Sequence, residues 1–383
     1  MNSLAPSAAS HNSESARTLR AQLLAHFQQS QNADGGWPFH MQGDSRVEPT
    51  CWALRALAGS SESAQSSITR GLAFLKSQQL SDGSWPATTG MSSGGWVTSL
   101  AASVLASFLA QLPAHEKSVH AAVQWLCDDY PRDSSRWQKF LNNFSSNKHA
   151  SHNDEFRGWG WTPRTSSWVE PTAFALMAFS SVSEDFSSGA PGSHSKPESS
   201  LSSGAAPLVS KSADFSSGAE TSASKSHVSI QLAKQISDRR ALAIGLLYDR
   251  MCAGGGWNCG NPRVYGVDGD SLVLPTCWAL LSLRDAPEHP NRQLSLAWLQ
   301  KSFATIASPG SLAIAQITIE AYAASPGSTG TPACAAVATP PRFRTLHDWS
   351  AEDLANQGTH VAAWASLALN PSRHWPARLE VPQ

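Results

Sequence analysis

A repeated loop motif constrains this chain more than any other feature of its sequence. Residues 31–37 read QNADGGW and residues 79–85 read QLSDGSW, so a QxxDGxW motif recurs after 48 residues. Degraded copies follow as GWGW at 158–161 and GGGW at 254–257. Self-similarity at a period of about 20–50 residues is typical of proteins that repeat one supersecondary unit. We therefore expect a repeat architecture.

A similar helix start follows three of the four loops. The segments VEPT at 47–50 and 169–172, and VLPT at 273–276, each lead into a strongly apolar stretch. Proline is tolerated at the first helical position because its missing N–H would have no partner there. Helices without a polar side are typically enclosed by neighbours. Six such helices are predicted, starting near Glu48, Thr98, Glu170, Val273, Leu312 and His360.

Each apolar helix has an amphipathic partner, in which apolar residues recur at helical spacing. These partners are predicted at 15–30, 62–79, 115–129, 229–251, 291–305 and 346–356. Six outer helices that alternate along the chain with six inner helices imply a closed double ring. The predicted fold is therefore all-α, an (α/α)6 barrel, or toroid, of six helical hairpins with QxxDGxW-type loops.

One toroid domain accounts for residues 14–371 of the 383-residue chain. Two insertions interrupt it. The serine-rich segment 181–229 is predicted to be disordered because it can bury little apolar surface, and 325–343 is predicted to be a flexible loop. Residues 1–13 are predicted to be a disordered N-terminus and residues 372–383 a tail.

Composition and charge exclude several classes of function. Charged residues make up 15% of the chain and the formal net charge is −1, so no nucleic-acid partner is predicted. The six cysteines contain no CxxC pair, which indicates free thiols in a reducing compartment. No secretory signal and no membrane-spanning apolar run is present. We expect a cytoplasmic protein without a transmembrane segment, for which peripheral membrane contact stays open.

The QxxDGxW repeat is the signature of the squalene cyclase and prenyltransferase repeat superfamily, which the chain resembles over nearly its whole length. Members include class II terpene cyclases, such as squalene–hopene cyclase, and the β subunits of protein prenyltransferases. The stretch GGWNCGN at 255–261 resembles one in bacterial repeat proteins, and the length leaves room for one barrel. The resemblance implies a single-barrel, bacterial-type terpenoid cyclase-like protein. It also implies structural roles for Gln31, Trp37, Gln79 and Trp85, because the motif residues tie neighbouring helices together in that family.

Class II terpene cyclases carry their catalytic acid in a DxDD motif, typically followed by Thr-Ala. This sequence has no DxDD, but alignment on Thr172-Ala173 puts Glu170 at the central acidic position. Such an acid needs a pKa raised by burial or by neighbouring carboxylates. Glu48 occupies the equivalent position in the first repeat. For both residues the alternative is a structural role, since a carboxylate at a helix N-terminus interacts favourably with the helix dipole.

Asp268 and Asp270 form a second acidic cluster before the fourth inner helix, and both are candidate catalytic groups. Prenyltransferase β subunits hold zinc with an Asp-x-Cys pair and a distant histidine. Asp268, Asp270 and His360 resemble that set, which implies a divalent metal, Zn or, with oxygen ligands, Mg. Solvated loop acids are the alternative, and the cyclase interpretation requires no cofactor. Because parallel inner helices share one face, these three residues and Glu170 are predicted to converge there.

Tryptophans and one tyrosine supply the candidate substrate contacts, because aromatic faces stabilise carbocations. Three recur at one position of the inner helices, where they either pack or line a cavity: Trp52, Trp278 and Trp364. Three others precede helices at the mouth of the ring and are favoured for ligand contact: Trp96, Trp168 and Tyr265.

These features favour an isoprenoid-handling enzyme of the terpene cyclase type, an isomerase in which Glu170 or Asp270 donates a proton within a tryptophan-lined cavity. Its partner would be an isoprenoid small molecule. Two alternatives stay open. One is a non-catalytic isoprenoid-binding module that has lost DxDD. The other is a carbohydrate-active α/α barrel, which requires paired carboxylates about 5–10 Å apart.

Overall fold

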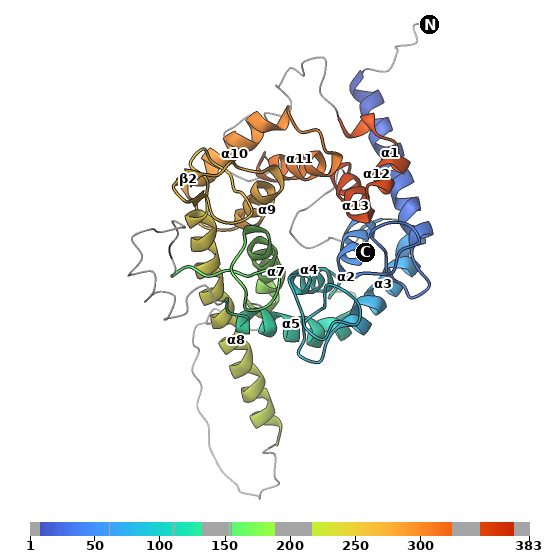
Figure 1. Ribbon diagram of the computed structural model, residues 1–383. Helices are drawn as coiled ribbons and strands as arrows, with labels where there is room; N and C mark the ends of the chain where they lie inside the picture. Colours follow the sequence, from blue (N-terminus) through green and yellow to red (C-terminus); the bar gives the residue numbers. More distant parts are fainter. Residues whose placement is uncertain are drawn as a thin grey trace, which may run out of the picture.

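The computed structural model describes residues 8–60, 62–109, 112–131, 153, 155–187, 217–323 and 345–370. The described residues form a double ring of helices with one small two-stranded sheet (Figure 1). The predicted fold class, an all-α toroid, is confirmed. No helix within these residues is long and apolar enough to cross a bilayer.

Six apolar helices form the inner ring: α2 (Val47–Leu57), α4 (Val97–Ser107), α7 (Val169–Ser187), α9 (Val273–Leu283), α11 (Pro309–Ala323) and α13 (Thr359–Ala368). Each packs against the next in chain order, and α13 packs against α2, which closes the ring (Figure 1). In α2 every residue except Glu48 is buried. Neighbours cover such a helix on all sides, which explains why it lacks a polar face.

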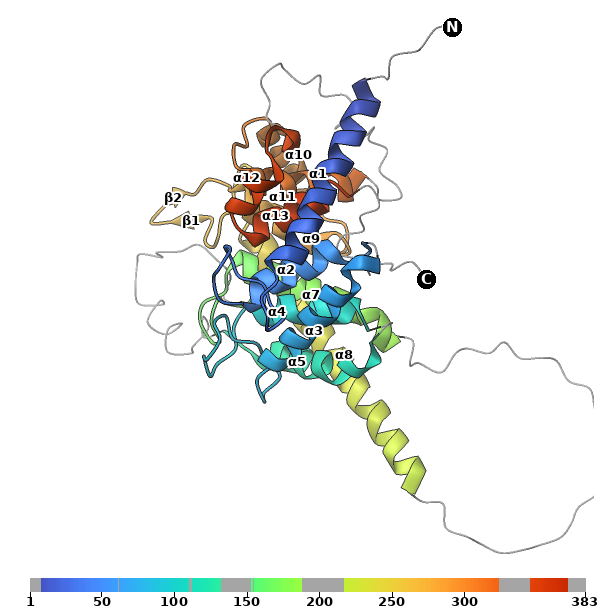
Figure 2. The same ribbon diagram turned by 90° about the vertical axis from the view of Figure 1, so that its right-hand side faces the viewer.

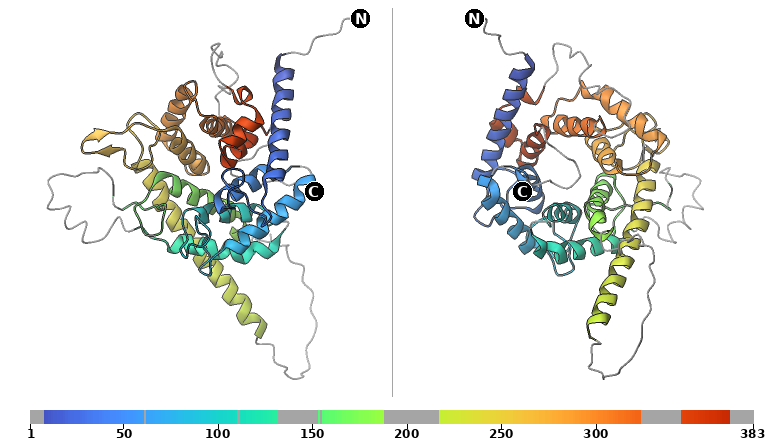
Figure 3. Two further views of the ribbon diagram at one scale, coloured as in Figure 1. Left: turned by 45° about the vertical axis from the view of Figure 1, so that its right-hand side comes forward. Right: turned by 180° about the vertical axis from the view of Figure 1, so that it is seen from behind.

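Six outer helices surround this ring: α1 (Ala8–Ser30), α3 (Gln65–Gln78), α5 (Glu116–Asp128), α8 (Ser217–Asp249), α10 (Pro290–Phe303) and α12 (Ala351–Asn356). Short 3-10 turns precede three of them: η1 (Glu62–Ala64), η2 (Pro113–His115) and η4 (Leu346–Asp348). Helix α8 is the longest, and its first half extends well beyond the ring (Figures 2 and 3).

The inner helices begin within three residues of their predicted starts, whereas the ends of the serine-rich segment differ from the prediction. Helix α7 continues to Ser187 and α8 begins at Ser217, so both ends of the 181–229 segment are helical. Helix α1 likewise begins at Ala8, within the segment 1–13. A helix that has formed in the ring can extend by one hydrogen bond for each added residue. The prediction of disorder was based on amino-acid composition, which does not take this extension into account. Residues 188–216, 325–343 and 372–383 lie outside the described residues.

The motif tryptophans join each loop to two helices. The indole N–H of Trp37 donates to the carbonyl oxygen of Phe27 in the preceding outer helix, at 2.8 Å. Its backbone N–H donates to Oγ1 of Thr50 in the following inner helix, at 2.9 Å. The same two bonds recur at Trp85, Trp159 and Trp257. Buried donors are costly when unpaired, so these bonds fix the loop between its helices.

The motif glutamines connect neighbouring hairpins. Nε2 of Gln31 donates to the carbonyl oxygen of Gly35 within its own loop and to that of Ser67 in the next outer helix, α3. Gln79 makes the equivalent pair of bonds, the second of them to α5. Gly35 itself has a φ of +90°, a left-handed conformation that favours glycine. The hydrogen bonds of these glutamines and tryptophans agree with the structural role expected for them.

Adjacent repeats are also linked where the inner helices begin. Three backbone N–H groups at inner-helix starts donate to the carbonyl that lies two residues after another repeat's motif tryptophan: Trp96 to Trp161, Val169 to Cys259 and Thr359 to Phe39. These loops gather at the N-terminal end of the inner helices, which we call the mouth of the ring (Figure 2). A hairpin of β1 (Arg263–Val264) and β2 (Val267–Asp268) projects from the same end.

Candidate active site

Four aromatic side chains meet on the axis of the ring, and we call them the aromatic cluster. They are Trp52 of α2, Phe174 of α7, Trp278 of α9 and Trp364 of α13. The ring centroids of the three tryptophans lie 5.6 Å apart in each pair, and that of Phe174 lies 5.1 Å from Trp278. Aromatic rings attract one another at such separations in stacked and edge-to-face arrangements. Helices α2 and α9 are opposite in the ring order, so these rings meet only because the ring is closed.

The tryptophans of the aromatic cluster were expected either to pack or to line a cavity. Trp52, Trp278 and Trp364 are 1%, 3% and 8% exposed, and each contacts the other two. They therefore point inward, as cavity-lining residues would, but they pack on one another. A ligand at the mouth would meet the cluster as an aromatic floor.

A second layer lies one helical turn nearer the mouth, since residues four apart share a helix face. We call it the mouth layer. Four of its members lie four residues before a member of the aromatic cluster, namely Glu48, Glu170, Leu274 and His360, and the fifth is Trp96, which packs beside Phe174. Two of these residues are carboxylic acids, one is an imidazole and two are apolar. The mouth layer thus places ionisable groups directly beside aromatic rings.

Glu48 is the mouth-layer acid with the more strongly raised pKa. Burial raises its pKa from 4.5 to about 7, and a hydrogen bond with the Trp52 side chain acts in the opposite direction. A carboxyl group with such a pKa retains its proton in a large fraction of molecules at neutral pH, as a general acid must. Because Trp52 belongs to the aromatic cluster, this acid lies against the cluster.

Glu170 is half-buried at the equivalent position of α7. Burial raises its pKa, while hydrogen bonds from its own backbone N–H and from the Cys259 thiol act against that rise. Its Oε2 atom is buried and has no hydrogen-bond partner among the described residues. An unpaired buried oxygen costs free energy as a charged group, so the site favours either protonation or a donor from a ligand.

His360 lies on α13, opposite α7 in the ring order. Its imidazole makes edge contacts with Trp364, at 5.1 Å between centroids, and with Phe39, at 6.0 Å. Burial lowers the pKa of His360, and the nearby His40 lowers it further, so the neutral imidazole is favoured. His360 Nδ1 and Trp364 Nε1 are both buried and have no hydrogen-bond partner in the described part of the chain.

The remaining aromatic candidates divide between the mouth and the surface. Trp96 packs beside Phe174 of the aromatic cluster, at 5.4 Å between centroids, and edge-on to Trp161, at 5.1 Å. Trp168 is 39% exposed and lies over the backbone of Gly260. Tyr265 is 75% exposed in the turn between β1 and β2. Of the three, Trp96 is the one that contacts the aromatic cluster.

The predicted acidic and metal-binding set does not assemble. Asp268 and Asp270 are exposed, and Asp268 forms an ion pair with Arg263 at 3.5 Å across the small sheet. In the described part of the chain, no group of three His, Cys, Asp or Glu side chains is arranged to hold a metal ion. The structure therefore does not bring Asp268 and Asp270 together with His360 as ligands. Asp268 ends strand β2 of the hairpin and Asp270 follows two residues later, and both side chains are exposed to solvent.

Three residues beside the mouth layer were not predicted from the sequence as site residues: Phe39, Trp161 and Cys259. Each lies two positions after a motif tryptophan, and each contacts a mouth-layer residue of another repeat: His360, Trp96 and Glu170 respectively. Burial and the Glu170 carboxyl raise the pKa of the Cys259 thiol to about 11, so it stays protonated as a donor. The constant offset from the motif was a signal that the sequence contained.

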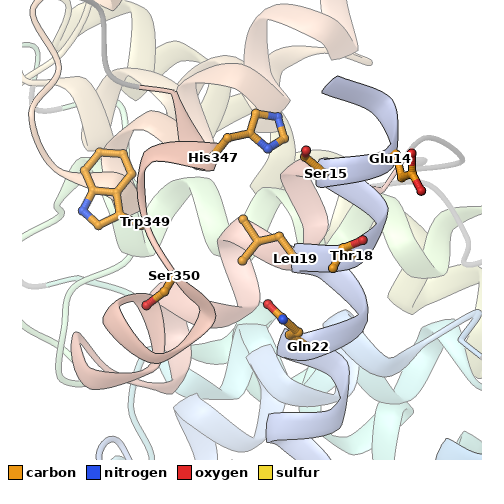
Figure 4. A pocket seen from close by; sticks show the side chains of 8 residues that line it. All are labelled: Glu14, Ser15, Thr18, Leu19, Gln22, His347, Trp349 and Ser350. Carbon is orange, nitrogen blue, oxygen red and sulfur yellow. The ribbon is translucent and has the colours of Figure 1, made fainter. Parts of the chain in front are cut away.

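A separate open cleft of about 520 Å³ lies between outer elements, away from the ring interior (Figure 4). It runs between α1 and the η4–α12 segment, where Leu19 and Trp349 are bordered by polar side chains of Glu14, Thr18 and Gln22. Its polar groups are mostly exposed to solvent, unlike those of the mouth layer.

Comparison with known proteins relates the fold to solved structures. No protein-family profile and no curated protein sequence matches the chain. A protein from Actinoplanes superposes with a TM-score of 0.52 and 16% identity, over 92% of this chain and 98% of that one. A variant of the type II terpene cyclase MstE from Scytonema, in complex with geranylgeranyl dihydroxybenzoate, gives 0.50 and 11%, over 93% and 98%. A glycosidase gives 0.38 and 13%, over 94% and 99%.

These similarities establish the architecture alone. At this level of identity, the chain shares with a type II terpene cyclase an α/α toroid of similar extent. A shared fold does not determine function, so the chemistry of the site depends on the residues present in this chain. The glycosidase superposition is too poor to bear on function.

Proposed function

We propose that the protein is a terpene cyclase-type isomerase that protonates an isoprenoid at the mouth of the ring. The observation that carries the proposal is the pair of carboxyl groups with raised pKa at the mouth: Glu48 is hydrogen-bonded to Trp52 of the aromatic cluster, and Glu170 lies one helical turn from Phe174. An apolar polyene needs an acid that is protonated at neutral pH, and the resulting cation needs π faces nearby. Both requirements coincide at this layer.

In the proposed reaction a carboxyl O–H transfers its proton to one carbon of an alkene. The alkene π electrons form the new C–H bond, and the adjacent carbon becomes a cation. Attack by the next alkene closes a ring. The cyclised cation then loses a proton from a carbon next to the cationic centre, whose C–H electron pair forms a new alkene, and the proton returns to the carboxylate directly or through water. Trp52 and Phe174, one turn below the two acids, would stabilise the moving positive charge through their ring faces.

The chain departs from DxDD enzymes in how its acids would be strengthened. Neighbouring carboxylates raise the pKa in an acidic motif, whereas desolvation is the leading cause at both Glu48 and Glu170. Glu48 has the higher pKa, and Glu170 has the free oxygen. Either acid satisfies the proposal, and substitution of each decides between them.

The test is incubation of the full chain with linear isoprenoids, namely farnesol, geranylgeraniol and squalene, with cyclic products detected by gas chromatography and mass spectrometry. Glu48→Gln or Glu170→Gln should abolish turnover, because the amide keeps the shape but has no transferable acidic proton. Glu116→Gln is the matched control, since Glu116 opens outer helix α5 and is exposed. Proton transfer from a carboxyl group needs no metal, so turnover should persist in EDTA.

Each other result would replace the proposal with a specific alternative. Binding of an isoprenoid without any cyclic product would favour a non-catalytic binding module. Release of reducing sugar from a glycoside, abolished by the same substitutions, would favour a carbohydrate-active barrel. Loss of activity in the Glu116→Gln control as well would show that the effect is not specific to the mouth layer.

Peripheral membrane contact forms part of the same proposal, because isoprenoids partition into lipid. Large apolar side chains are exposed in four loops at the mouth: Met41, Met91, Trp168 and Tyr265. Single protruding apolar and aromatic residues are suited to the membrane interface. Sedimentation with phosphatidylcholine vesicles tests this membrane contact. The unchanged protein should sediment with the vesicles, and the double variant Tyr265→Ser, Met41→Ser should leave less protein in the pellet. Equal recovery of the variant and the unchanged protein in the pellet would contradict a membrane contact made by the mouth loops.

A further inference from the structure

Two nitrogen atoms inside the ring lack, among the residues that the structure describes, the hydrogen bonds that their burial requires. Trp364 is 8% exposed, and its Nε1–H has no acceptor. His360 Nδ1, one turn nearer the mouth on the same helix, is also buried without a partner. By contrast, the four motif tryptophans in the walls of the ring all donate their indole N–H groups to backbone carbonyls. A buried unpaired polar group costs about 1–3 kcal/mol, so an unpaired donor on the axis is a feature that requires a cause.

The two atoms belong to one local unit. His360 and Trp364 are four residues apart on α13, so they share a helix face, and their rings are in edge contact at 5.1 Å between centroids. Gly358 packs against the imidazole, where a Cβ atom would lie 3.1 Å from Nδ1. Phe39 packs against the other side of His360. The imidazole is therefore held in place, while its Nδ1 lacks a partner.

We propose that His360 Nδ1 and Trp364 Nε1 form a subsite for the hydroxyl group of an isoprenoid alcohol, and this deepens the proposed function on which it rests. An indole N–H can only donate, so the ligand must supply an acceptor. Nδ1 of a neutral histidine either donates or accepts, depending on the tautomer. A hydroxyl group both donates and accepts, so it can pair with the indole N–H and with Nδ1 in either tautomer. A hydrocarbon would leave both unpaired.

The position of the subsite orients the ligand. Helix α13 is opposite α7 in the ring order, so a hydroxyl group held by His360 and Trp364 lies across the axis from Glu170. The apolar chain of the alcohol then lies over the aromatic cluster, between the subsite and that acid. Helix α13 would therefore recognise the hydroxyl oxygen of the substrate, and α7 would carry the acid that protonates its alkene.

The experiment compares alcohols with matched hydrocarbons by equilibrium dialysis, using farnesol against farnesene and octanol against octane. The unchanged protein should bind farnesol about ten-fold more tightly than farnesene, the effect of one net hydrogen bond. Trp364→Phe and His360→Phe each keep an aromatic ring and remove the nitrogen, so the preference should fall towards one while farnesene still binds. Trp278→Phe is the matched control, because it removes an indole from the same aromatic cluster but should keep the preference.

The outcomes separate this inference from the proposed function. Equal binding of farnesol and farnesene by the unchanged protein would overturn the subsite and leave isoprenoid binding supported. A preference for octanol over octane that depends on Trp364, without farnesol binding, would support the subsite and overturn the isoprenoid substrate. Binding of none of the four would overturn both. As a second readout, the indole N–H proton resonance of Trp364 should shift with farnesol and not with farnesene.

Discussion

Thr359 and Pro38 are hydrogen-bonded across almost the whole length of the chain. Oγ1 of Thr359, at the start of the last inner helix, donates to the carbonyl oxygen of Pro38 in the first motif loop, at 2.6 Å. The backbone N–H of Thr359 donates to the neighbouring Phe39 carbonyl at 2.8 Å. These two bonds fasten the last repeat to the first and hold His360 beside Phe39 at the mouth.

We expect Thr359→Val to lower the free energy of unfolding by about 1–3 kcal/mol, because it leaves a buried carbonyl oxygen without its donor while conserving shape. Urea denaturation monitored by circular dichroism measures the loss. Thr69→Val is the control: Thr69 makes a local bond to Gln65 on an exposed helix face, and a change within about 0.5 kcal/mol is expected there. Equal effects at both positions would show that ring closure does not depend on Thr359.

Gly83→Ala and Gly90→Ala separate backbone strain from steric overlap. Both glycines have left-handed φ values, +90° and +87°. A Cβ atom at Gly83 would lie 2.7 Å from the backbone of Ala121, whereas at Gly90 nothing lies within 4 Å. Both substitutions incur strain of about 1–2 kcal/mol, and Gly83→Ala should lose at least that much again. Thermal unfolding of the two variants provides the comparison. A larger loss at Gly90 would contradict the packing of the second motif loop on α5.

The stability of the chain should depend on Glu48 between pH 4.5 and pH 7. Since its pKa rises from 4.5 to about 7 on folding, the folded state holds a proton in this window that the unfolded state has lost. The stabilisation linked to this proton is complete below pH 4.5 and is lost as the pH rises to about 7. Between pH 5 and pH 8 the unchanged protein should therefore lose about 1–3 kcal/mol more than Glu48→Gln.

Urea titrations of both proteins at the two pH values measure this difference, and other titrating groups cancel because they are common to both. The exposed Glu116→Gln variant should follow the unchanged protein. If Glu48→Gln also followed it, Glu48 would not be a desolvated acid, and Glu170 alone would remain as the acid of the proposed function.

Gln79→Ala should destabilise the protein, whereas Gln78→Ala should not. Nε2 of Gln79 bridges the carbonyl oxygens of Gly83 and Ser118, both at 2.9 Å, and so ties the second loop to α5. Gln78, its neighbour, reaches only Ser77 at 3.4 Å on the surface. Loss of two partly buried hydrogen bonds should cost about 1–3 kcal/mol, against about 0.5 kcal/mol or less for Gln78→Ala. Differential scanning calorimetry of the two variants distinguishes these expectations.

The architecture could be predicted because its causes are local and repeated. Each motif tryptophan is bonded to the helices on either side of its own loop, and each motif glutamine reaches only the next hairpin. Such contacts favour the same residue types at similar spacing in successive repeats, so the pattern can be recognised several times in one sequence. The threonines that receive the tryptophan N–H groups follow at a constant offset of 13 residues in three loops.

The fourth loop departs from that spacing, and the sequence analysis did not predict that its aspartates would be exposed. Trp257 and Thr276 are 19 residues apart, and the additional residues fold into the β1–β2 hairpin. In the sequence, Asp268 and Asp270 precede an inner helix, and Glu48 lies in the first turn of one. Asp268 in the hairpin and Asp270 just after it are exposed to solvent, while Glu48 remains against Trp52.

The sequence by itself thus determined the helical hairpins, their order and the closed ring, because periodicity and short-range hydrogen bonds specify them. Only the tertiary structure decided which acids are desolvated and which aromatic rings meet. Trp52 and Trp278 come from opposite sides of the ring and lie 226 positions apart, yet they stack at 5.6 Å. Burial and proximity of that kind depend on how the whole ring closes, since a pKa responds to all the atoms around a group and not to its neighbours in the chain.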